Sequence, residues 1–392
     1  MMETLYEILG INNDITTRKK IADEAGIPIQ TLNFYDDNNI LPDERILQII
    51  QTITGKSKLE IMLRLGIYNS KIKELIAQKA SLFCASERTQ YQSTNKNISP
   101  KIVLRTQFGQ LFQGDCLDLL SHVDCNKFDL IFADPPFNLN KLYPSKINDN
   151  LHASKYISWC EAWLDECIRT LKVGGSLFIW NIPKWNTYLS AYLNQRLTFR
   201  NWIAVDIKYS LPIANKLYPS HYSLLYYIKG DKPNTFKPDR LPMEICKHCF
   251  HEIKDYGGYK NKMNPLGISL SDVWYDIPPV RHVKYKARQN ANELSTKLID
   301  RIIELSTNVG DVIFDPFGGA GTTYITAELK KRHWMGVEIG PTDDIINRFN
   351  NIAAEQDLLI KYRRGYNALF SPEIHRKRVE KGFWTCDSFK EK

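Results

Sequence analysis

Apolar positions follow two different patterns, one in the first 80 residues and another from about residue 103. The first stretch repeats apolar residues at helical spacing and predicts several short helices. Farther along, short apolar runs typical of strands alternate with helical patterns such as YISWCEAWLDECIRTLK, expected to end at Gly174-Gly175, and LSTKLIDRIIELS. The expected strands are FDLIFA, SLFIWN, WIAVDIKYS, SLLYYIKG, DVIFDPF and WMGVEIG. This alternation predicts an α/β domain with a mainly parallel sheet and helices on both faces.

The helical region, residues 1–80, contains the spacing of a helix-turn-helix. Ala22, Gly26 and Leu32 supply a small residue under the crossing, a glycine in the turn and an apolar anchor on the second helix. The loop and helix that follow resemble those of the Cro and C1 repressor type. A helical bundle used only for packing has the same pattern, so both interpretations stay open. If this region binds DNA, the residues expected to face the groove are Gln30, Thr31 and Asn33.

Charge and composition narrow the class of protein. The 392 residues include 52 Lys and Arg against 44 Asp and Glu, a net charge of +8 that favours an anionic partner. The start of the chain does not resemble a signal peptide, and no apolar run approaches the roughly 18 residues of a membrane helix. Eight scattered cysteines do not form a disulfide framework, so we expect a cytoplasmic protein. Polar residues 81–102 are expected to form a linker.

Three expected strand ends carry residues suited to a nucleoside. In DPFGGAGTT, residues 315–323, the glycines allow a tight turn and close approach of a ligand, and a helix begins at Thr322. Glu338 ends the next strand, where an acid holds ribose hydroxyls in nucleotide-binding units. Asp115 and Cys116 end an earlier strand, where polar groups suit an adenine edge. Because no GxxxxGK[ST] is present, a nucleoside triphosphate cradle is disfavoured.

The order of these motifs resembles the β-class of S-adenosylmethionine-dependent amino DNA methyltransferases. DPPF at 134–137 is followed much later by DPFGGAGTT, with GDC just upstream, and the resemblance covers about residues 103–345. It implies a Rossmann-like methyltransferase sheet, circularly permuted, with a catalytic half at 103–230, a target-recognition region at 231–289, and a cofactor half with a C-terminal extension at 290–392. The implied S-adenosylmethionine-binding residues are Asp115, Cys116, Asp315, Phe317, Gly319, Gly321, Thr322 and Glu338. Residues 290–295, NANELS, depart from the family's usual His-Pro start, so no cofactor contact is assigned to them.

The resemblance assigns catalysis to Asp134, Pro135, Pro136 and Phe137. An exocyclic amine on a base is a poor nucleophile because its lone pair is conjugated into the ring. Two fixed acceptors, the Asp134 carboxylate and the Pro135 carbonyl, would hold its N–H groups, and Pro136 restricts the backbone that carries this carbonyl. Phe137 would stack on a base extruded from the duplex.

The target-recognition region combines cations with aromatic residues, a pattern that suits phosphate contact and base stacking. The expected DNA contacts there are Tyr256, Tyr259, Lys260, Arg281, Lys284, Lys286 and Arg288, although a solvated basic face has the same pattern. In the same region, Cys246 and Cys249 with His248 and His251 suggest zinc. No second CxxC follows, so we expect free thiols and no metal site.

The function expected from the resemblance is site-specific methylation of adenine N6 in double-stranded DNA, within a restriction–modification pair. Cytosine-N4 methylation by the same architecture is the first alternative, because Asp at position 134 correlates with adenine imperfectly. A DNA-binding regulator with a vestigial methylase half is the second, and RNA methylation is a weaker third. The sequence leaves open the recognition site and whether the chain acts as a monomer or a homodimer.

Overall fold

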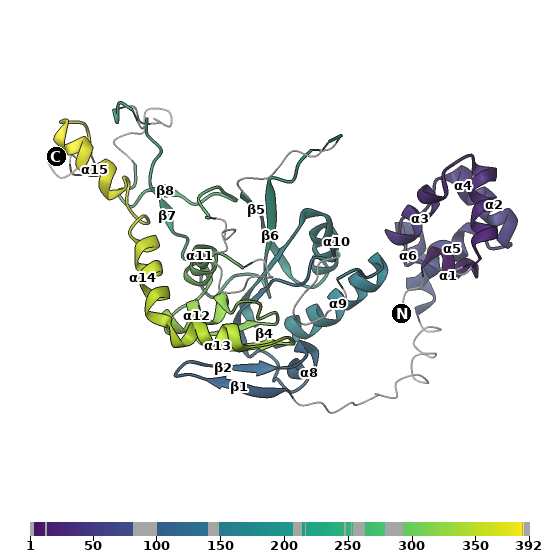
Figure 1. The fold of residues 1–392 in the computed structure, drawn as a ribbon, viewed down its shortest axis with the longest axis horizontal. Helices are drawn as coiled ribbons and strands as arrows, with labels where there is room; N and C mark the ends of the chain where they lie inside the picture. The colour runs from purple at the N-terminus through teal and green to yellow at the C-terminus, as the bar shows by residue number, and fades with distance from the viewer. Residues whose placement is uncertain are drawn as a thin grey trace. The chain divides into compact units, whose positions relative to one another are not determined.

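The fold is described from a computed structural model of the chain (Figure 1). The structure describes residues 4–11, 14–80, 100–139, 149–206, 214–215, 217–246, 248–251, 253, 263–278, 293–385 and 387. The described residues group into two compact units. One contains those up to residue 80 with 138–139 and 149–162, and the other contains 100–137 and those from 163 onward. Each unit has a hydrophobic core of its own.

The chain up to residue 80 folds into short helices, most of which have a side-chain cap at their start. Their bounds are α1 (Leu5–Leu9), α2 (Ile15–Ala25), α3 (Ile29–Asp37), α4 (Glu44–Thr54), α5 (Lys58–Arg64) and α6 (Ser70–Gln78). The side chains of Asp14, Asp43 and Ser57 each accept a hydrogen bond from the backbone N–H three residues ahead. Each such bond satisfies one of the free donors at a helix start. Local sequence signals therefore fix where several of these helices begin.

The positions that suggested a helix-turn-helix have the expected local structure. Ala22 and Leu32 are buried, and Gly26 ends α2 in the left-handed region with φ of 64°. On α3, Gln30 is exposed and Thr31 is half-buried. The Asn33 side-chain oxygen accepts a hydrogen bond of 2.8 Å from the Tyr6 hydroxyl, so part of its hydrogen-bonding capacity serves packing. DNA contact by α3 stays a prediction.

From residue 100 onward, strands and helices alternate as predicted. The bounds are β1 (Lys101–Arg105), β2 (Gly109–Gln113), α8 (Cys116–Leu120), β3 (Phe128–Ala133), α9 (Ala153–Thr170), β4 (Leu171–Asn181), α10 (Pro183–Leu193), β5 (Thr198–Asp206), β6 (His221–Ile228), β7 (Arg240–Leu241), β8 (Ile268–Ser269), β9 (Val273–Trp274), α11 (Thr296–Ser306), β10 (Val312–Asp315), α12 (Thr322–Leu329), β11 (His333–Glu338), α13 (Asp343–Asn350), α14 (Ile352–Arg363) and α15 (Pro372–Glu380). None of the helices within the described ranges is long and apolar enough to cross a membrane.

Nine strands form one sheet, in the order β1-β2-β11-β10-β3-β4-β6-β5-β9. The five neighbours β2, β11, β10, β3 and β4 are all parallel, whereas β6 runs antiparallel to both β4 and β5. This confirms the predicted Rossmann-like α/β fold, and the description as a circular permutation stays an interpretation of the strand order along the chain. Because parallel strands end at the same edge, the residues that follow β2, β11, β10 and β3 share one edge of the sheet.

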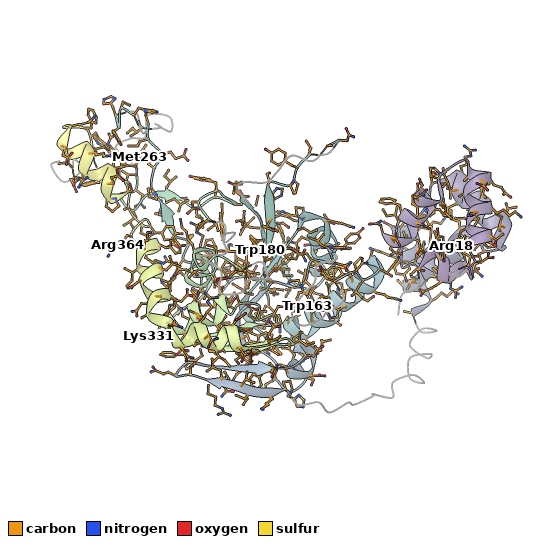
Figure 2. All side chains as sticks on the ribbon, in the orientation of Figure 1. Arg18, Trp163, Trp180, Met263, Lys331 and Arg364 are labelled. Atoms are coloured by element: carbon orange, nitrogen blue, oxygen red, sulfur yellow. The ribbon has the colours of Figure 1, made fainter. Side chains whose placement is uncertain are left out.

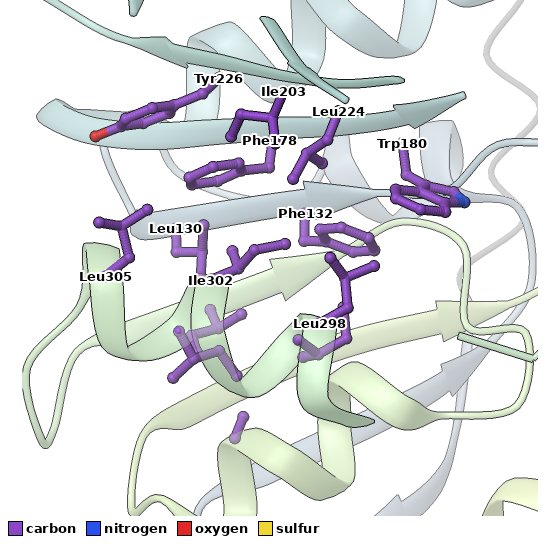
Figure 3. Packing of buried hydrophobic residues seen from close by; sticks show 14 of the residues in the cluster. Leu130, Phe132, Phe178, Trp180, Ile203, Leu224, Tyr226, Leu298, Ile302 and Leu305 are labelled. Atoms are coloured by element: carbon purple, nitrogen blue, oxygen red, sulfur yellow. The ribbon is translucent and has the colours of Figure 1, made fainter. Parts of the chain in front are cut away.

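Both faces of the sheet are covered. On β3, Leu130 and Phe132 belong to a core cluster that also contains Leu298 and Ile302 of α11, and Figure 3 shows these side chains between the strands and that helix. The intervening Ile131 and Ala133 point to the other face and are fully buried as well. Burial on both faces explains why the last four residues of β3, LIFA, form a continuous apolar run rather than an alternating one.

The predicted end of the long helix is wrong. Gly174 and Gly175 were expected to terminate it, but α9 ends at Thr170 and β4 runs through both glycines. The Lys229 ammonium donates to the carbonyl oxygens of Ile168 and Leu171, each at 2.8 Å. A distant cation thus satisfies carbonyls at this helix end, so the helix ends without a glycine cap.

Candidate active site

The predicted cofactor and catalytic motifs follow neighbouring strands. Ile313 and Phe314 of β10 pair with Leu130 and Ile131 of β3. The Gly-rich loop that begins at Asp315 and the Asp-Pro-Pro-Phe motif that begins at Asp134 therefore leave the sheet side by side. The structure brings together at one edge two motifs separated by about 180 residues in sequence.

Asp315 organises the start of the Gly-rich loop. Its carboxylate accepts hydrogen bonds from the Thr323 hydroxyl at 2.6 Å and from the Phe317 N–H at 2.9 Å. Burial raises the pKa of Asp315 to about 7, against the lowering effect of these two hydrogen bonds, and nearby Glu338 raises it further. The carboxyl group thus ties the strand end to α12 across the loop.

The glycines of the loop have distinct roles. Gly321 has φ of 75° and stands directly before α12, where a Cβ would lie 2.7 Å from Cγ2 of Ile345. Gly319 has φ of 52°, and the nearest atom to its missing Cβ is the Phe317 carbonyl oxygen at 3.8 Å, so the space beside it is open. One glycine allows close packing, and the other leaves room for a ligand beside the turn.

Glu338 connects the ends of β11 and the Gly-rich loop. One of its carboxylate oxygens accepts a hydrogen bond from the Gly319 N–H and the other from the Gly340 N–H, both at 2.8 Å. The residue is 8% exposed. Glu338 thus lies beside the open glycine turn, and its contact with the ribose hydroxyls of the cofactor stays a prediction.

Asp115 and Cys116 lie at the end of β2 as predicted. Asp115 caps α8 by accepting a hydrogen bond of 2.8 Å from the Leu117 N–H, and the Gly114 N–H donates to the Glu338 carbonyl at 3.1 Å. Cys116 is buried, and this burial raises the pKa of its thiol well above the usual range. Cys116 is therefore suited to apolar contact rather than to nucleophilic chemistry.

Two other predicted cofactor residues contact protein side chains. The Phe317 ring packs edge-to-face on Trp163, with ring centroids 5.2 Å apart. The Thr322 hydroxyl accepts a hydrogen bond of 3.0 Å from the Arg348 guanidinium. Thr322 is 3% exposed, so a contact from this residue to the cofactor would come from its backbone N–H at the start of α12.

The side chains of the catalytic motif are partly covered by protein. Pro135 and Phe137 are buried, while Asp134 and Pro136 are half-buried. The Phe137 ring is only 6% exposed and lies against Tyr222 of β6, with centroids 5.8 Å apart. The ring predicted to stack on a base is thus largely covered by protein, and the half-buried Asp134 keeps access to solvent.

Trp185 contacts the catalytic motif, although the sequence motifs did not predict this. Its indole N–H donates a hydrogen bond of 2.7 Å to the Phe137 carbonyl, from the first turn of α10. The position of Trp185 just after β4 could have indicated this contact, because the carboxyl end of β4 lies next to that of β3. Near the end of β4, the Trp180 ring packs on Tyr222, which Phe137 also contacts, with centroids 4.9 Å apart.

A second set of unpredicted hydrogen bonds fixes the residues that follow the motif. Asn138 has φ of 53°, and its side chain exchanges two hydrogen bonds with the backbone of Leu151, at 2.6 and 2.7 Å. The Asp149 carboxylate accepts from the N–H groups of Asn138 and Leu139, at 2.7 and 3.0 Å. These bonds join residues 138–139 to 149–151, a pairing that sequence spacing alone does not reveal.

The predicted DNA contacts of the target-recognition region, Tyr256, Tyr259, Lys260, Arg281, Lys284, Lys286 and Arg288, lie outside the described residues. Within the described residues, Cys246 and Cys249 are not joined by a disulfide. In the described part of the chain, His, Cys, Asp and Glu side chains do not gather into a group that could hold a metal ion.

Comparisons with known proteins agree with this geometry. The family model described as "DNA methylase" (N6/N4 methylases) matches residues 128–343, which span both strand-end motifs. The chain belongs to this N6/N4 DNA methylase family. It is therefore a DNA methyltransferase, and S-adenosylmethionine is the cofactor that this membership implies.

Individual relatives extend the similarity. The chain is 48% identical over 361 residues to Type II methyltransferase M.BamHI of Bacillus amyloliquefaciens, across 91% of this chain and 85% of that protein. It is 31% identical to DNA adenine methyltransferase YhdJ of Escherichia coli, across 60% of this chain and 81% of that protein. Among solved structures, the PvuII DNA methyltransferase (cytosine-N4-specific) aligns with a TM-score of 0.47 and 18% identity, across 66% of this chain and 94% of that one.

Proposed function

We propose that the chain transfers a methyl group from S-adenosylmethionine to the exocyclic amine of a base in duplex DNA, as the methyltransferase of a restriction–modification pair. The observation that carries this proposal is the pairing of β3 with β10, because it sets Asp134 beside the Gly-rich loop. The relatives named Type II methyltransferases support the restriction–modification role.

In this proposal each residue has a separate role. Glu338 and the open turn at Gly319 bind the cofactor, which when bound supplies a methyl group on a sulfonium. The Asp134 carboxylate and the Pro135 carbonyl accept the two N–H groups of the amine, so that the nitrogen lone pair is directed out of the ring's conjugation. Trp185 holds the backbone at Phe137 and so keeps these acceptors in place.

The proposed target atom is adenine N6, as the aspartate at position 134 favours. The similarity to a protein named DNA adenine methyltransferase also supports it. Cytosine N4 is the second candidate, and one observation favours it: Phe137 is only 6% exposed, so it offers a small stacking face that suits a pyrimidine better than a purine.

The N-terminal helices are proposed to add DNA contacts through a helix-turn-helix formed by α2 and α3, with Gln30 and Thr31 nearest the groove. The buried Ala22 and Leu32 and the left-handed Gly26 support this geometry. A regulator with an inactive methylase half is the competing function, and it requires DNA binding without methyl transfer.

Sequencing of DNA from a methylation-free host that expresses the chain tests the proposal. N6-methyladenine at one recurrent sequence supports the first candidate, and N4-methylcytosine at such a sequence supports the second. An unmodified genome, with the protein folded and expressed, would contradict both and favour the regulator. Expression of Asp134→Ala in the same host is the control for background modification.

A further inference from the structure

Residues 364–385 lie beyond the part of the chain that the family model matches, yet they do not form a separate tail. They pack on the described residues 240–246, 248–251, 253 and 263–269, around the buried side chains of Met243, Leu369 and Phe370. The other apolar residues of this cluster are Ile245, Ile253, Met263, Ile268, Ile374 and Trp384. Figure 2 shows Met263 in this part of the molecule, near α15. We refer to these described residues between 240 and 269, together with residues 364–385, as the C-terminal module.

Backbone hydrogen bonds join the two segments of the C-terminal module. The Met243 N–H donates to the Leu369 carbonyl at 2.8 Å, and the Leu369 N–H donates to the Pro265 carbonyl at 2.9 Å. Arg240 and Asn367 exchange two further bonds, at 2.9 and 3.0 Å. Because each segment satisfies backbone groups of the other, we expect neither to keep this structure alone.

Arg378 of α15 is the central polar contact of the C-terminal module. It is 1% exposed, and its guanidinium donates to the carbonyl oxygens of Trp384, Phe250 and His251. Phe250 has φ of 58°, and its ring lies beneath the ammonium of Lys377 at 4.7 Å. A helix outside the family match thus fixes a turn inside the predicted target-recognition region.

The C-terminal module also carries a net positive charge. Its 41 described residues contain six Lys and Arg against three Asp and Glu, a net charge of +3. The Arg376 side chain is 70% exposed and pairs with the exposed Glu380 at 3.6 Å. Such exposed ion pairs contribute little to stability, so a DNA phosphate can replace the Glu380 carboxylate as the partner of Arg376 with little loss of free energy. Arg364 is exposed too (Figure 2).

We infer that the C-terminal module is a single duplex-DNA-binding unit, and that Arg364 and Arg376 contact backbone phosphates of the bound duplex. The inference rests on the proposed function and adds residues 364–385 to the surface that binds the substrate. The excess of cations favours a nucleic acid as the occupant, and the contacts to Met243, Phe250 and Pro265 join these cations to the predicted target-recognition region.

The test compares two double neutralisations in the full chain. Arg364→Gln/Arg376→Gln removes the proposed contacts, and Lys101→Gln/Arg105→Gln removes two exposed cations from β1, at the sheet edge opposite β9. Fluorescence anisotropy with a mixed-sequence duplex, over a series of salt concentrations, gives affinity and salt dependence. We expect the first variant to bind several-fold more weakly and its log–log salt slope to shrink by about 1 to 2, at roughly 0.9 per lost contact. Equal effects of both variants, or none, would overturn the inference.

Arg378→Met tests the shared structure of the C-terminal module. It keeps the aliphatic stem but removes the donors to the turn at 250–251, so we expect weaker DNA binding and faster proteolysis at that turn, with unchanged S-adenosylmethionine affinity. Unchanged DNA affinity and proteolysis would contradict the inference. Failure of the proposed function is distinguishable, because a protein that binds duplex through Arg364 and Arg376 but methylates no base retains the module and loses only the enzymatic assignment.

Discussion

The indole N–H of Trp185 donates a hydrogen bond of 2.7 Å to the carbonyl oxygen of Phe137. Both residues are buried, at 3% and 6% exposure, so water does not readily replace either partner. The bond joins the start of α10 to the last residue of the Asp-Pro-Pro-Phe motif. It therefore fixes the backbone just after Asp134 and Pro135, which carry the two proposed acceptors of the target amine.

Trp185→Phe should lower kcat by more than its loss of folding stability explains. The substitution keeps an aromatic ring but leaves the Phe137 carbonyl without its donor, at a cost of about 1 to 3 kcal/mol. A small displacement of the acceptors should reduce kcat by roughly 10- to 100-fold, with little change in the affinity for S-adenosylmethionine. Steady-state methylation kinetics and calorimetric binding measure the two effects.

Trp274→Phe is the matched control for Trp185→Phe. Trp274 is 1% exposed, and its indole N–H donates to the Ser271 carbonyl at 2.8 Å, a bond of the same kind away from the catalytic motif. A similar loss of stability with nearly normal kcat is expected. If both variants lose kcat equally, the effect of Trp185 is general destabilisation rather than positioning.

Asp134→Ala should abolish methyl transfer and leave S-adenosylmethionine binding largely intact. The residue is proposed to accept a hydrogen bond from the amine, whereas the predicted cofactor contacts of the Gly-rich loop and Glu338 come from other strands. Asp134→Asn is the informative companion, because its amide oxygen retains one acceptor but lacks the charge. Turnover by the alanine variant would rule out the assigned mechanism.

The sequence was sufficient to predict the strand ends of the site. Each is a continuous apolar run followed at once by a polar residue, as at Asp134, Asp315 and Glu338, and a parallel sheet places such ends on one edge. The contacts of Trp185 and Arg378 were not predictable in this way. Each contact joins segments distant in sequence. Because the acceptors are backbone carbonyls, which every residue has, the sequence of the accepting segment gives no sign of the contact.

The end of α9 shows why a local rule can fail. Gly174 and Gly175 have the composition of a helix terminus, but Lys229, some 60 residues later, satisfies the terminal carbonyls. Gly174 instead has φ of 76° within β4, and its N–H donates to the Lys229 carbonyl at 2.6 Å. The tertiary contact, and not the glycine pair, decides where the helix stops.

Gly321→Ala should destabilise the cofactor loop more than an ordinary left-handed glycine substitution. Gly321 combines φ of 75° with a Cβ position 2.7 Å from Cγ2 of Ile345. Gly310→Ala is the control, because Gly310 has φ of 87° but no atom within 4 Å of its Cβ position. We expect about 1 kcal/mol for the backbone strain in both, and a further loss only at Gly321. Thermal unfolding measures the difference, and equal losses would show that Ile345 moves aside freely.

Asp315 should make the free energy of unfolding depend on pH. Burial raises its pKa to about 7, from 3.8 for an unperturbed aspartate, so between these values the folded state holds a proton that the unfolded chain has released. Stability should therefore fall as the pH rises from about 4 to 7, by about 4 kcal/mol at 1.36 kcal/mol per pKa unit, and stay level above. Asp315→Asn cannot titrate, so urea unfolding of both proteins over this range isolates the effect. Parallel pH profiles would contradict the raised pKa.

Deletion of residues 1–80 should leave S-adenosylmethionine affinity within about twofold of the full chain. The predicted cofactor residues all follow Gly114, and the strands that carry them belong to the second compact unit. The first unit includes residues 149–162 as well, where Lys155 pairs with Glu7 at 3.7 Å, so the deletion uncovers part of α9. We therefore expect some loss of thermal stability but retained cofactor binding by calorimetry. Loss of cofactor binding in a chain that remains folded by circular dichroism would show that the N-terminal helices are part of the methyltransferase core, and not an accessory DNA-binding domain.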